Sequence, residues 1–550
     1  MRTPLPIIYL VIILIGCHSP IEDRVPNLLF IMMDDLGYGQ FSIYDDSLTT
    51  SSFDPYFVDL VHAHQDYTPE EALAFSKRAI PTLNQLAHQG VRFPQAYTSS
   101  RLCAPSRLGI ATGILQNRFG VYRNTDCEAM GLPHGSHLAE KLKDLGYATA
   151  HIGKWHIGQR RRQMLIDATQ RHGIADTLTY GQIARQYPNI YQELLEEGYY
   201  GSVVDANHPL QNGFDYYYGY NNWASQFYNS TLVWENYQHA GKQEGYNTDV
   251  FTDKALTFMK EQVIEQKPFY VQLHYHAVHD SLQPKAPDQY FNQFNSNSYD
   301  LNNFYAHLFG VDFNIQRLID YLKSVGEFEN TLIVFTSDNG AQAGGPSVLP
   351  GNAPFSGHKG TYFQGGFRVP MFLHWPQGMV GSHRLDQTVS TMDILPTMVD
   401  AAKGEIPKDL DGVSLLPLIR GVSDAPVHDH LIWAGIHSRA WGFLINTSYK
   451  THTTEREFAP PSWVVKKDSF LLRYVGIIEP NVYEEQPEGG PPSMELFNIN
   501  LDPEEGKNLA MEMPEKVNEL SRIYYEEARN FPPPVVWAKS KWNEIKAIRR

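Results

Sequence analysis

Residues 25–39 read VPNLLFIMMDDLGYG, an apolar run that ends in two aspartates and is closed by glycine. Residues 330–340, NTLIVFTSDNG, have the same form and end in Asp338 and Asn339. Short apolar runs bounded by turn residues are typical of strands that are buried on both faces, as in a parallel sheet. Because such sheets bind ligands outside the carboxyl ends of their strands, we expect the polar residues of both runs at one functional edge.

The alternation of strand-like and helical segments predicts the fold class. We expect an α/β protein with a large, doubly wound domain around a parallel or mixed sheet over residues 24–425. Short strand-like pieces followed by one amphipathic helix predict a smaller α+β subdomain over residues 426–550. The strand-like and helical segments between the two runs and after them include 136–147, 147–152, 267–276, 313–326 and 369–376.

Composition limits the classes of function. The chain has 550 residues, of which 42% are hydrophobic and 19% charged, so a folded protein of enzyme size is expected. The formal net charge of −16 argues against a nucleic-acid partner, because phosphate-binding proteins need a positive surface. An anionic substrate in a local basic pocket remains compatible with this charge.

The N-terminal segment MRTPLPIIYLVIILIGCHSP predicts export. Its apolar run is too short to span a bilayer as a helix and fits the core of a signal peptide. Leu14-Ile15-Gly16-Cys17 resembles a bacterial lipobox, which predicts a signal over residues 1–17 and a lipid on Cys17. We therefore expect a lipid-anchored protein of the outer membrane that faces the periplasm or the cell surface. An ordinary export signal with an incidental cysteine is the alternative.

Four oxygen-bearing residues follow the two quoted runs and predict a metal site. Hard divalent cations prefer carboxylate and amide oxygens, and Ca²⁺ is the best match for three carboxylates and an amide. The four residues are Asp34, Asp35, Asp338 and Asn339.

Basic residues follow other predicted strands or lie in nearby loops. Lys154 and His156 come after the strand-like YATAHI, His279 comes after VQLHYHAV, and Lys359 lies in SGHKGTY. We expect these side chains to add positive charge at the same edge of the sheet. Cations beside a metal form a site for a tetrahedral anion, because they stabilise the oxygen charge that grows in the transition state.

The segment CAPSRLGIATG, residues 103–113, places a thiol beside this set. Pro105 suits the first turn of a helix, so Cys103 is expected at a helix N-terminus, with Arg107 one turn later. A tyrosine-phosphatase loop would need arginine where Gly109 stands, and no papain-like signature surrounds the thiol. A structural disulfide with Cys127 remains the alternative, since an exported protein can form one.

The segment C-x-P-S-R-x-x-x-x-T-G resembles the first signature of the type I, formylglycine-dependent sulfatases. GYATAHIGKWH, residues 146–156, resembles their second signature, and DDLGYG, TSDNG and GHKGTYFQGGFRVP continue the likeness in order along most of the chain. The resemblance implies the fold of the alkaline-phosphatase superfamily and hydrolysis of sulfate esters. Two positions depart from the family pattern: Gln364 stands where glutamate is common, and Val278 where proline is common.

The resemblance also implies the chemistry of Cys103. A maturation enzyme, either formylglycine-generating or anaerobic sulfatase-maturating, would oxidise Cys103 to Cα-formylglycine, which is hydrated to a geminal diol. One hydroxyl would attack sulfur, and the second would expel sulfate as the aldehyde forms again. The residues implied as ligands of one Ca²⁺ ion are Asp34, Asp35, Cys103, Asp338 and Asn339.

Roles for the basic residues follow from the same resemblance. Arg107 and His156 would orient the formylglycine, and His156 is also implied as a base. Lys154, His279 and Lys359 would bind sulfate oxygens, and His279 or Lys359 would protonate the leaving oxygen.

Three loops outside the strong matches, residues 41–78, 159–205 and 450–490, are rich in Tyr, His, Arg and Gln, and exposed aromatic rings in them could stack on sugar. The resemblance to an exported, tethered sulfatase implies a glycan substrate. The expected substrate is a sulfated polysaccharide or oligosaccharide, either an algal glycan such as ulvan, carrageenan or fucoidan or a glycosaminoglycan. A phosphonate or phosphate ester hydrolase of the same superfamily and a catalytically silent glycan-binding lipoprotein are the alternatives. The residues proposed for sugar contacts are His208, Asn222, His276 and His437.

Overall fold

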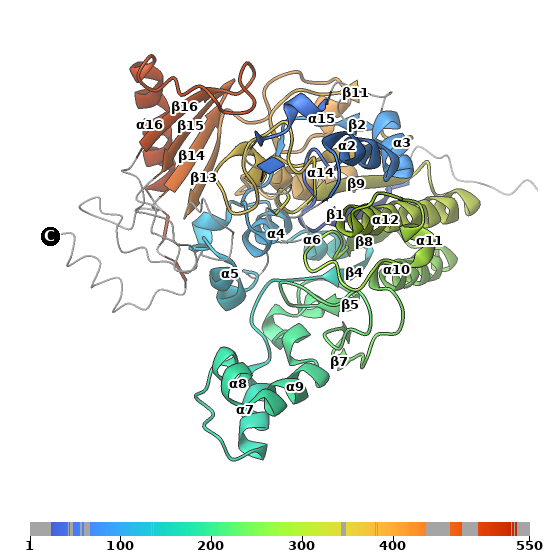
Figure 1. Cartoon of the computed structure of the whole chain (residues 1–550). Coiled ribbons are helices and arrows are strands. Elements are labelled where there is room, and N and C mark those ends of the chain that lie inside the picture. The colour runs from blue at the N-terminus through green and yellow to red at the C-terminus, as the bar shows by residue number, and fades with distance from the viewer. Residues whose placement is uncertain are drawn as a thin grey trace, which may run out of the picture.

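The computed structural model is built around two sheets (Figure 1). Its described residues are 24–41, 43, 48–55, 58–59, 66–133, 135, 137–342, 348–379, 381, 383–435, 462–475, 493–529, 531–532 and 534–535. The large sheet has ten strands in the order β11-β2-β10-β9-β1-β8-β4-β5-β6-β7. These strands are β1 (Asn27–Met33), β2 (Val91–Arg92), β4 (Ala148–Lys154), β5 (Tyr216–Tyr220), β6 (Trp234–Glu235), β7 (Gln238–His239), β8 (Phe269–His274), β9 (Thr331–Ser337), β10 (Met371–His374) and β11 (His383–Arg384). A two-stranded sheet pairs β3 (Ala96–Tyr97) with β12 (Val389–Ser390).

The centre of the large sheet is parallel. Strand β1 pairs in parallel with both β8 and β9, and β4 pairs in parallel with β8 and β5. Strand β10 runs antiparallel to β9, so the sheet is mixed. All seven residues of β1 and of β9 are buried, as expected for strands that are covered on both faces. The predicted fold class is confirmed.

Helices cover both faces of this sheet, and the alternation along β1 shows how. Leu29, Ile31 and Met33 belong to one hydrophobic cluster, which includes residues of α2, α3, α10 and α12. Leu28, Phe30 and Met32 belong to a second cluster on the opposite face, which includes residues of α4, α6 and α14. The helices are α2 (Pro69–Arg78), α3 (Pro81–Gln89), α4 (Cys103–Thr112), α5 (Asn124–Met130), α6 (Leu138–Asp144), α10 (Asn247–Glu265), α11 (Asp288–Phe291), α12 (Tyr299–Ser324), α13 (Gln364–Phe367), α14 (Ile394–Ala401) and α15 (Leu416–Ile419).

A separate antiparallel sheet carries the C-terminal part of the chain. It consists of β13 (Leu431–Gly435), β14 (Ser462–Lys467), β15 (Phe470–Val475) and β16 (Ser493–Asn498), and α16 (Pro514–Ala528) packs on it. The Trp463 ring stacks on Tyr524 of α16 with ring centroids 4.3 Å apart. This is the smaller subdomain that the sequence predicts, although its exact boundary at residue 426 stays a prediction.

A small helical group projects from the large domain between β4 and β5 (Figure 1). It consists of α7 (Arg162–Arg171), α8 (Tyr180–Gln186) and α9 (Pro188–Glu196). Among the described helices, none has the length and apolar character that crossing a membrane requires. The predicted signal at residues 1–17 lies outside the described residues, as does His437.

Candidate active site

The polar residues after β1 and β9 lie against each other, as the sequence predicts. The backbone N–H of Asp35 donates to Asp338 Oδ1 at 3.2 Å, and the Asn339 amide donates to Asp35 Oδ1 at 2.7 Å. The two strands are parallel neighbours with Met33 opposite Ser337, so their ends arrive at the same level of the sheet. All four side chains are buried.

Cys103 begins helix α4 at this edge. Leu102 is the extended N-cap residue, and Gly113 ends the helix in the left-handed conformation with φ of 66°. The Cys103 thiol lies 3.9 Å from Asp35 Oδ1, and only 1% of the residue is exposed. Burial raises the pKa of this thiol to about 12, so it is protonated at neutral pH and is a weak nucleophile as it stands.

The two buried cysteines do not form the disulfide that was the alternative. Both Cys103 and Cys127 are free thiols. Cys127 lies in α5 and donates instead to the backbone carbonyl of Ala104 at 3.4 Å. The thiol of Cys103 is thus left facing the acidic residues.

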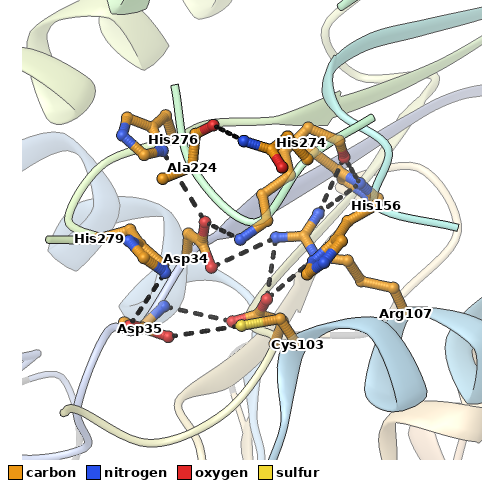
Figure 2. A network of polar contacts seen from close by, with 12 residues as sticks. Asp34, Asp35, Cys103, Arg107, His156, Ala224, His274, His276 and His279 are labelled. Carbon is orange, nitrogen blue, oxygen red and sulfur yellow. Dashed lines mark hydrogen bonds and ion pairs between the residues drawn. The ribbon is translucent and has the colours of Figure 1, made fainter. Parts of the chain in front are cut away.

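Arg107 joins α4 to the ends of four strands, β1, β4, β8 and β9 (Figure 2). Its Nε and Nη2 atoms contact Asp338 Oδ2 at 3.0 and 2.9 Å, and Nη2 lies 3.6 Å from Asp34 Oδ1. Its Nη1 donates to the carbonyl of Lys154 at 2.9 Å and lies 3.2 Å from His274 Nδ1. Burial raises the pKa of Asp338 to about 6, with the charge of Asp34 adding to the rise and Arg107 opposing it.

Two lysines neutralise the neighbouring aspartates. Lys154 Nζ donates to Asp34 Oδ2 at 2.6 Å, and Lys359 Nζ lies 2.7 and 2.8 Å from the two carboxylate oxygens of Asp35. Burial alone would raise the pKa of Asp35, but Lys359, His279 and Lys154 together hold this pKa below its usual range. The same contact keeps the pKa of Lys359 well above its usual range despite burial. Lys359 therefore carries its charge at neutral pH.

The loop that carries Lys359 is attached to the C-terminal part of the chain. Ser356 Oγ donates to the carbonyl of Glu504 at 2.6 Å, and the backbone N–H of Gln364 donates to Glu505 Oε1 at 2.7 Å. The backbone N–H of Lys359 itself donates to the carbonyl of Ala341 at 2.9 Å. These bonds fix the position from which Lys359 extends.

Two histidines complete the group, but they are neutral. Burial lowers the pKa of His156 and of His279 to about 3, even though the carboxylates beside them work in the opposite direction. The expected contribution of both rings to the positive charge is therefore wrong for this folded state. The positive charge of the site comes from Arg107, Lys154 and Lys359.

The backbone of two site residues is left-handed. Asp35 has φ of 59° and His156 has φ of 56°, a conformation that costs free energy for residues with a side chain. His156 Nε2 lies 3.3 Å from Glu128 Oε1 of α5, and its Nδ1 is buried with no hydrogen-bond partner. Such strain is typical of positions where the direction of a side chain matters for function.

The unpaired oxygens of the site test whether a cation fits. Asp34 Oδ1 and Asn339 Oδ1 are buried and accept no hydrogen bond. Buried polar atoms without partners are rare in proteins, and oxygen atoms in this state are suited to a hard cation. Atoms of four side chains also lie within 4.8 Å of one another in a group of metal-ligating type, namely Asp34, Asp35, Cys103 and His279. The side-chain oxygens of Asp34, Asp35, Asp338 and Asn339 form an oxygen-rich set that fits Ca²⁺.

Comparison with known proteins identifies the family. The sequence model of the Sulfatase family matches residues 26–404, which is more than half of the chain. The chain belongs to the sulfatase family. It is 31% identical over 541 residues to a protein named uncharacterized sulfatase YdeN of Escherichia coli, and the match covers 95% of this chain and 89% of that protein.

One further relative supports this placement, and one solved structure shows the same fold. N-acetylgalactosamine-6-sulfatase of Rattus norvegicus is 29% identical, with 73% of this chain and 67% of that protein covered. The crystal structure of Ps i-CgsB in complex with k-i-k-neocarrahexaose has the same fold, with a TM-score of 0.67 and 21% identity over 96% of this chain and 98% of that chain. The protein is a sulfuric ester hydrolase.

The residues predicted to contact sugar have different positions in this sulfatase. His276 lies in the site, 4.0 Å from Asp34 Oδ2, and Tyr220 contacts its Nδ1 at 3.0 Å. Asn222 is buried and holds a loop through Arg160 and Ala224. His208 is buried elsewhere, where its ring nitrogens bond the carbonyl of Asn236 and the N–H of Leu210, so this position gives no support to a sugar contact.

The sulfatase site also contains residues that the sequence analysis does not single out. Glu128 contacts His156, Tyr220 contacts His276, and His274 contacts Arg107. Tyr220 and His274 end buried strands, a position that marks them as candidates. Glu128 lies on the short helix α5, and no spacing in the sequence connects it with His156.

Proposed function

We propose that the protein hydrolyses sulfate esters of a sulfated glycan, with Cys103 converted to formylglycine and with one bound Ca²⁺ ion. The observation that carries this proposal is the convergence of unpaired acidic oxygens, two lysines and Cys103 at one buried edge of the sheet. The names of relatives support a glycan substrate, since one acts on N-acetylgalactosamine 6-sulfate by its name and another was solved with a carrageenan-type hexasaccharide.

The oxygen-bearing residues would hold the ion. Asp34 and Asn339 each offer an unpaired oxygen, and Asp35 and Asp338 flank them. Ca²⁺ bound there supplies positive charge that polarises sulfate oxygens and favours deprotonation of a nearby hydroxyl. Residue 103, at the N-terminus of α4, would complete this set.

Formylglycine at position 103, as a geminal diol, supplies one hydroxyl as the nucleophile and a second through which sulfate is released. The surrounding side chains keep this group in place. Arg107 is locked by Asp338 and by the carbonyl of Lys154, so its guanidinium holds the helix end against the strands. His156 presents an unpaired Nδ1, and Glu128 at Nε2 fixes the ring so that Nδ1 can accept a proton.

Lys154 and Lys359 would bind the sulfate oxygens. Lys154 contacts the carboxylate of Asp34, and Lys359 contacts that of Asp35. A bound cation would compete for these carboxylates and leave ammonium donors for an anion. His279 lies 3.7 Å from Asp35 Oδ2 and 3.5 Å from Lys359 Nζ. Of these two predicted donors, Lys359 carries the proton that the leaving oxygen needs, and His279, whose pKa is lowered to about 3, lies beside it as a neutral ring.

We further propose that the protein is exported and anchored through Cys17, and that a maturation enzyme acts on Cys103. Both follow from the sequence and the family. A Cys17→Ala variant should leave the membrane fraction and lose metabolic labelling with a fatty acid. Labelling that persists in this variant would rule out the anchor.

The deciding experiment measures sulfate release from a panel of sulfated glycans. Carrageenan, ulvan, fucoidan, chondroitin sulfate and heparin oligosaccharides are incubated with the full chain, and free sulfate and product masses are determined. We expect release from at least one class and none with a Cys103→Ala variant. Faster turnover of an aryl phosphate than of the matching aryl sulfate would instead identify a phosphate ester hydrolase.

The state of residue 103 is tested on the same preparation. Mass spectrometry of the peptide that contains residue 103 should show an aldehyde in place of the thiol in active protein. Full activity with an unmodified thiol would contradict the proposed nucleophile.

A further inference from the structure

One tryptophan differs from the others in the described part of the chain. Five of the six described tryptophans are at most 7% exposed, whereas Trp223 is 50% exposed. It lies in the loop that follows β5, next to Asn222. Single exposed apolar side chains are normal on protein surfaces, so exposure alone says little about function. The position of Trp223 is what makes it informative.

Trp223 lies beside the group that handles the leaving oxygen. Its ring centroid is 6.0 Å from that of His279, which in turn lies 3.5 Å from Lys359 Nζ and 3.7 Å from Asp35 Oδ2. Figure 2 shows His279 next to Asp35 and includes Ala224 of the tryptophan loop. A large apolar face thus adjoins a charged, anion-binding site.

The loop that presents Trp223 is held firmly on both sides. The side-chain oxygen of Asn222 accepts from Arg160 Nη2 at 2.6 Å, and the side-chain amide nitrogen of Asn222 donates to the backbone carbonyl of Ala224 at 2.9 Å. The Asn221 amide donates to the carbonyl of Gly158 at 3.0 Å. A side chain on a fixed loop loses little conformational entropy when a ligand binds to it.

We propose that Trp223 is the platform on which the sugar ring that carries the sulfate stacks. This inference rests on the proposed sulfatase activity and specifies its substrate as a ring form. A pyranose ring has an apolar face of C–H groups that packs on an aromatic face, and tryptophan offers the largest such face. The sulfate would reach Lys154 and Lys359 while its ring covers Trp223. An open-chain sulfate ester has the same anion but no rigid face for this contact.

The test compares ring and open-chain forms of the same sulfated sugars. Galactose 6-sulfate, N-acetylgalactosamine 6-sulfate and glucosamine 6-sulfate are assayed beside their borohydride-reduced alditols, and kcat/KM is measured by sulfate release. We expect the wild-type protein to prefer the best ring substrate over its alditol by about tenfold, which corresponds to about 1.4 kcal/mol. Trp223→Ala should lose this preference, mainly through a higher KM for the ring form.

Two variants and one inhibitor serve as controls. Trp223→Phe retains an aromatic face and should recover most of the preference. Phe313→Ala removes an aromatic side chain that is 44% exposed on α12, and it should change nothing. Inorganic sulfate reports the anion site alone, so its inhibition constant should be the same in wild type and in Trp223→Ala.

The outcomes separate this inference from the proposed function. Sulfate release with an equal ring preference in wild type and Trp223→Ala overturns the platform and leaves the sulfatase activity intact. A loss of sulfate inhibition in Trp223→Ala likewise overturns it, because the residue would then support the anion site. Absence of sulfate release from every sugar and every glycan of the panel overturns both.

Discussion

Two buried arginines of this protein have opposite surroundings. Arg473 of β15 contacts Glu495 Oε2 at 2.6 Å, contacts Glu505, donates to the carbonyl of Tyr362 at 3.3 Å and stacks on Phe363. None of the polar atoms of Arg473, Glu495 and Glu505 is both buried and without a hydrogen-bond partner. This cluster joins the small sheet to the large domain and needs nothing more.

The cluster around Arg107 is equally buried but incompletely paired. Asp34 Oδ1, Asn339 Oδ1 and His156 Nδ1 lack a hydrogen-bond partner, although Arg107 itself is paired with Asp338. Unpaired buried groups reduce stability, so they persist where a ligand completes them. The comparison teaches that the Arg473 cluster, whose polar atoms are all satisfied, holds elements together. The Arg107 cluster leaves two side-chain oxygens without hydrogen bonds at the edge of the sheet where chemistry is proposed.

The largest expected effect concerns the two buried cysteines. Cys103→Ala should lower turnover at least about 10⁵-fold, because removing a nucleophile removes the reaction path. Cys127→Ala is the matched control, since Cys127 is buried in a hydrophobic cluster and its thiol donates to a backbone carbonyl of α4. It should retain turnover and lose some stability. Comparable activity in both variants, measured by sulfate release, would contradict the assignment of Cys103 as the source of the nucleophile.

Breaking the paired cluster should reduce stability rather than catalysis. Arg473→Met leaves Glu505 buried without its partner and should lower the free energy of unfolding by about 3–5 kcal/mol. Removing both charges in Arg473→Met/Glu505→Gln should cost less than the single change. Arg171, an exposed arginine paired with Glu193 and Glu197, is the control, and Arg171→Met should cost about 1 kcal/mol or less. Thermal or denaturant unfolding measures all three, and equal losses would contradict the comparison.

Calcium should complete the unpaired cluster. At a concentration of about 100 times its Kd, Ca²⁺ should stabilise the folded protein by about 2.7 kcal/mol, and this gain should disappear in Asn339→Ala. Asn352 is the matched control, because its side chain is paired with the backbone of Ala341 and Gly357. Asn352→Ala should lower Tm by the same amount with calcium and with chelator. A calcium-dependent Tm in Asn339→Ala would rule out this residue as a ligand.

Glu128 should act only through His156. Glu128→Gln keeps the shape of the side chain but removes the charge beside Nε2, and it should lower kcat about 10- to 100-fold with little change in KM. The pH dependence of kcat should shift as well, which a purely structural role would not cause. Glu140 is the control, because it pairs with another histidine, His137, at a distance of 3.2 Å and does not contact the site. Glu140→Gln should leave kcat and its pH profile unchanged.

The smallest effect is the pH dependence of the contact between His428, just before β13, and Asp393, just before α14. His428 Nε2 lies 2.9 Å from Asp393 Oδ1. Burial lowers the pKa of His428, but the charges of Asp393 and Asp411 raise it by more, so the net pKa is above 6.5. Because the pKa is raised on folding, the stabilisation is complete below pH 6.5 and is lost as pH rises through the higher folded value. His428→Asn should remove this loss, a difference of about 1–2 kcal/mol in unfolding measurements. An identical pH dependence in both proteins would contradict it.

The sequence predicts the strand ends well and their partners poorly. The acidic pairs after β1 and β9 are readable because each closes an apolar run, and parallel strands necessarily bring such ends together. Glu128 has no such signal, since its contact with His156 depends on how α5 packs beside α4. The neutral state of His156 and His279 is likewise invisible in sequence, because it results from burial.

Residue type alone was a weak guide to the substrate side. The sequence suggests His208 and Asn222 through their polar side chains, and in the fold both bond to backbone segments. Trp223, one position after Asn222, was not selected, because a single aromatic residue in a loop has no periodicity or motif. Its significance depends on the distance to His279, which only the three-dimensional structure gives.

Ser356 and Gln364 are hydrogen-bonded to residues 504 and 505, which lie outside the part of the chain that matches the family model. The family match ends at residue 404. The loop that carries Lys359 lies between Ser356 and Gln364, and it is held by residues that come a hundred positions later in the chain. A version that ends at residue 404 should keep the acidic residues of the site but lose the hydrogen bonds that hold the loop of Lys359. Residues 504 and 505 therefore help to position Lys359, although neither belongs to the predicted catalytic or metal-binding residues.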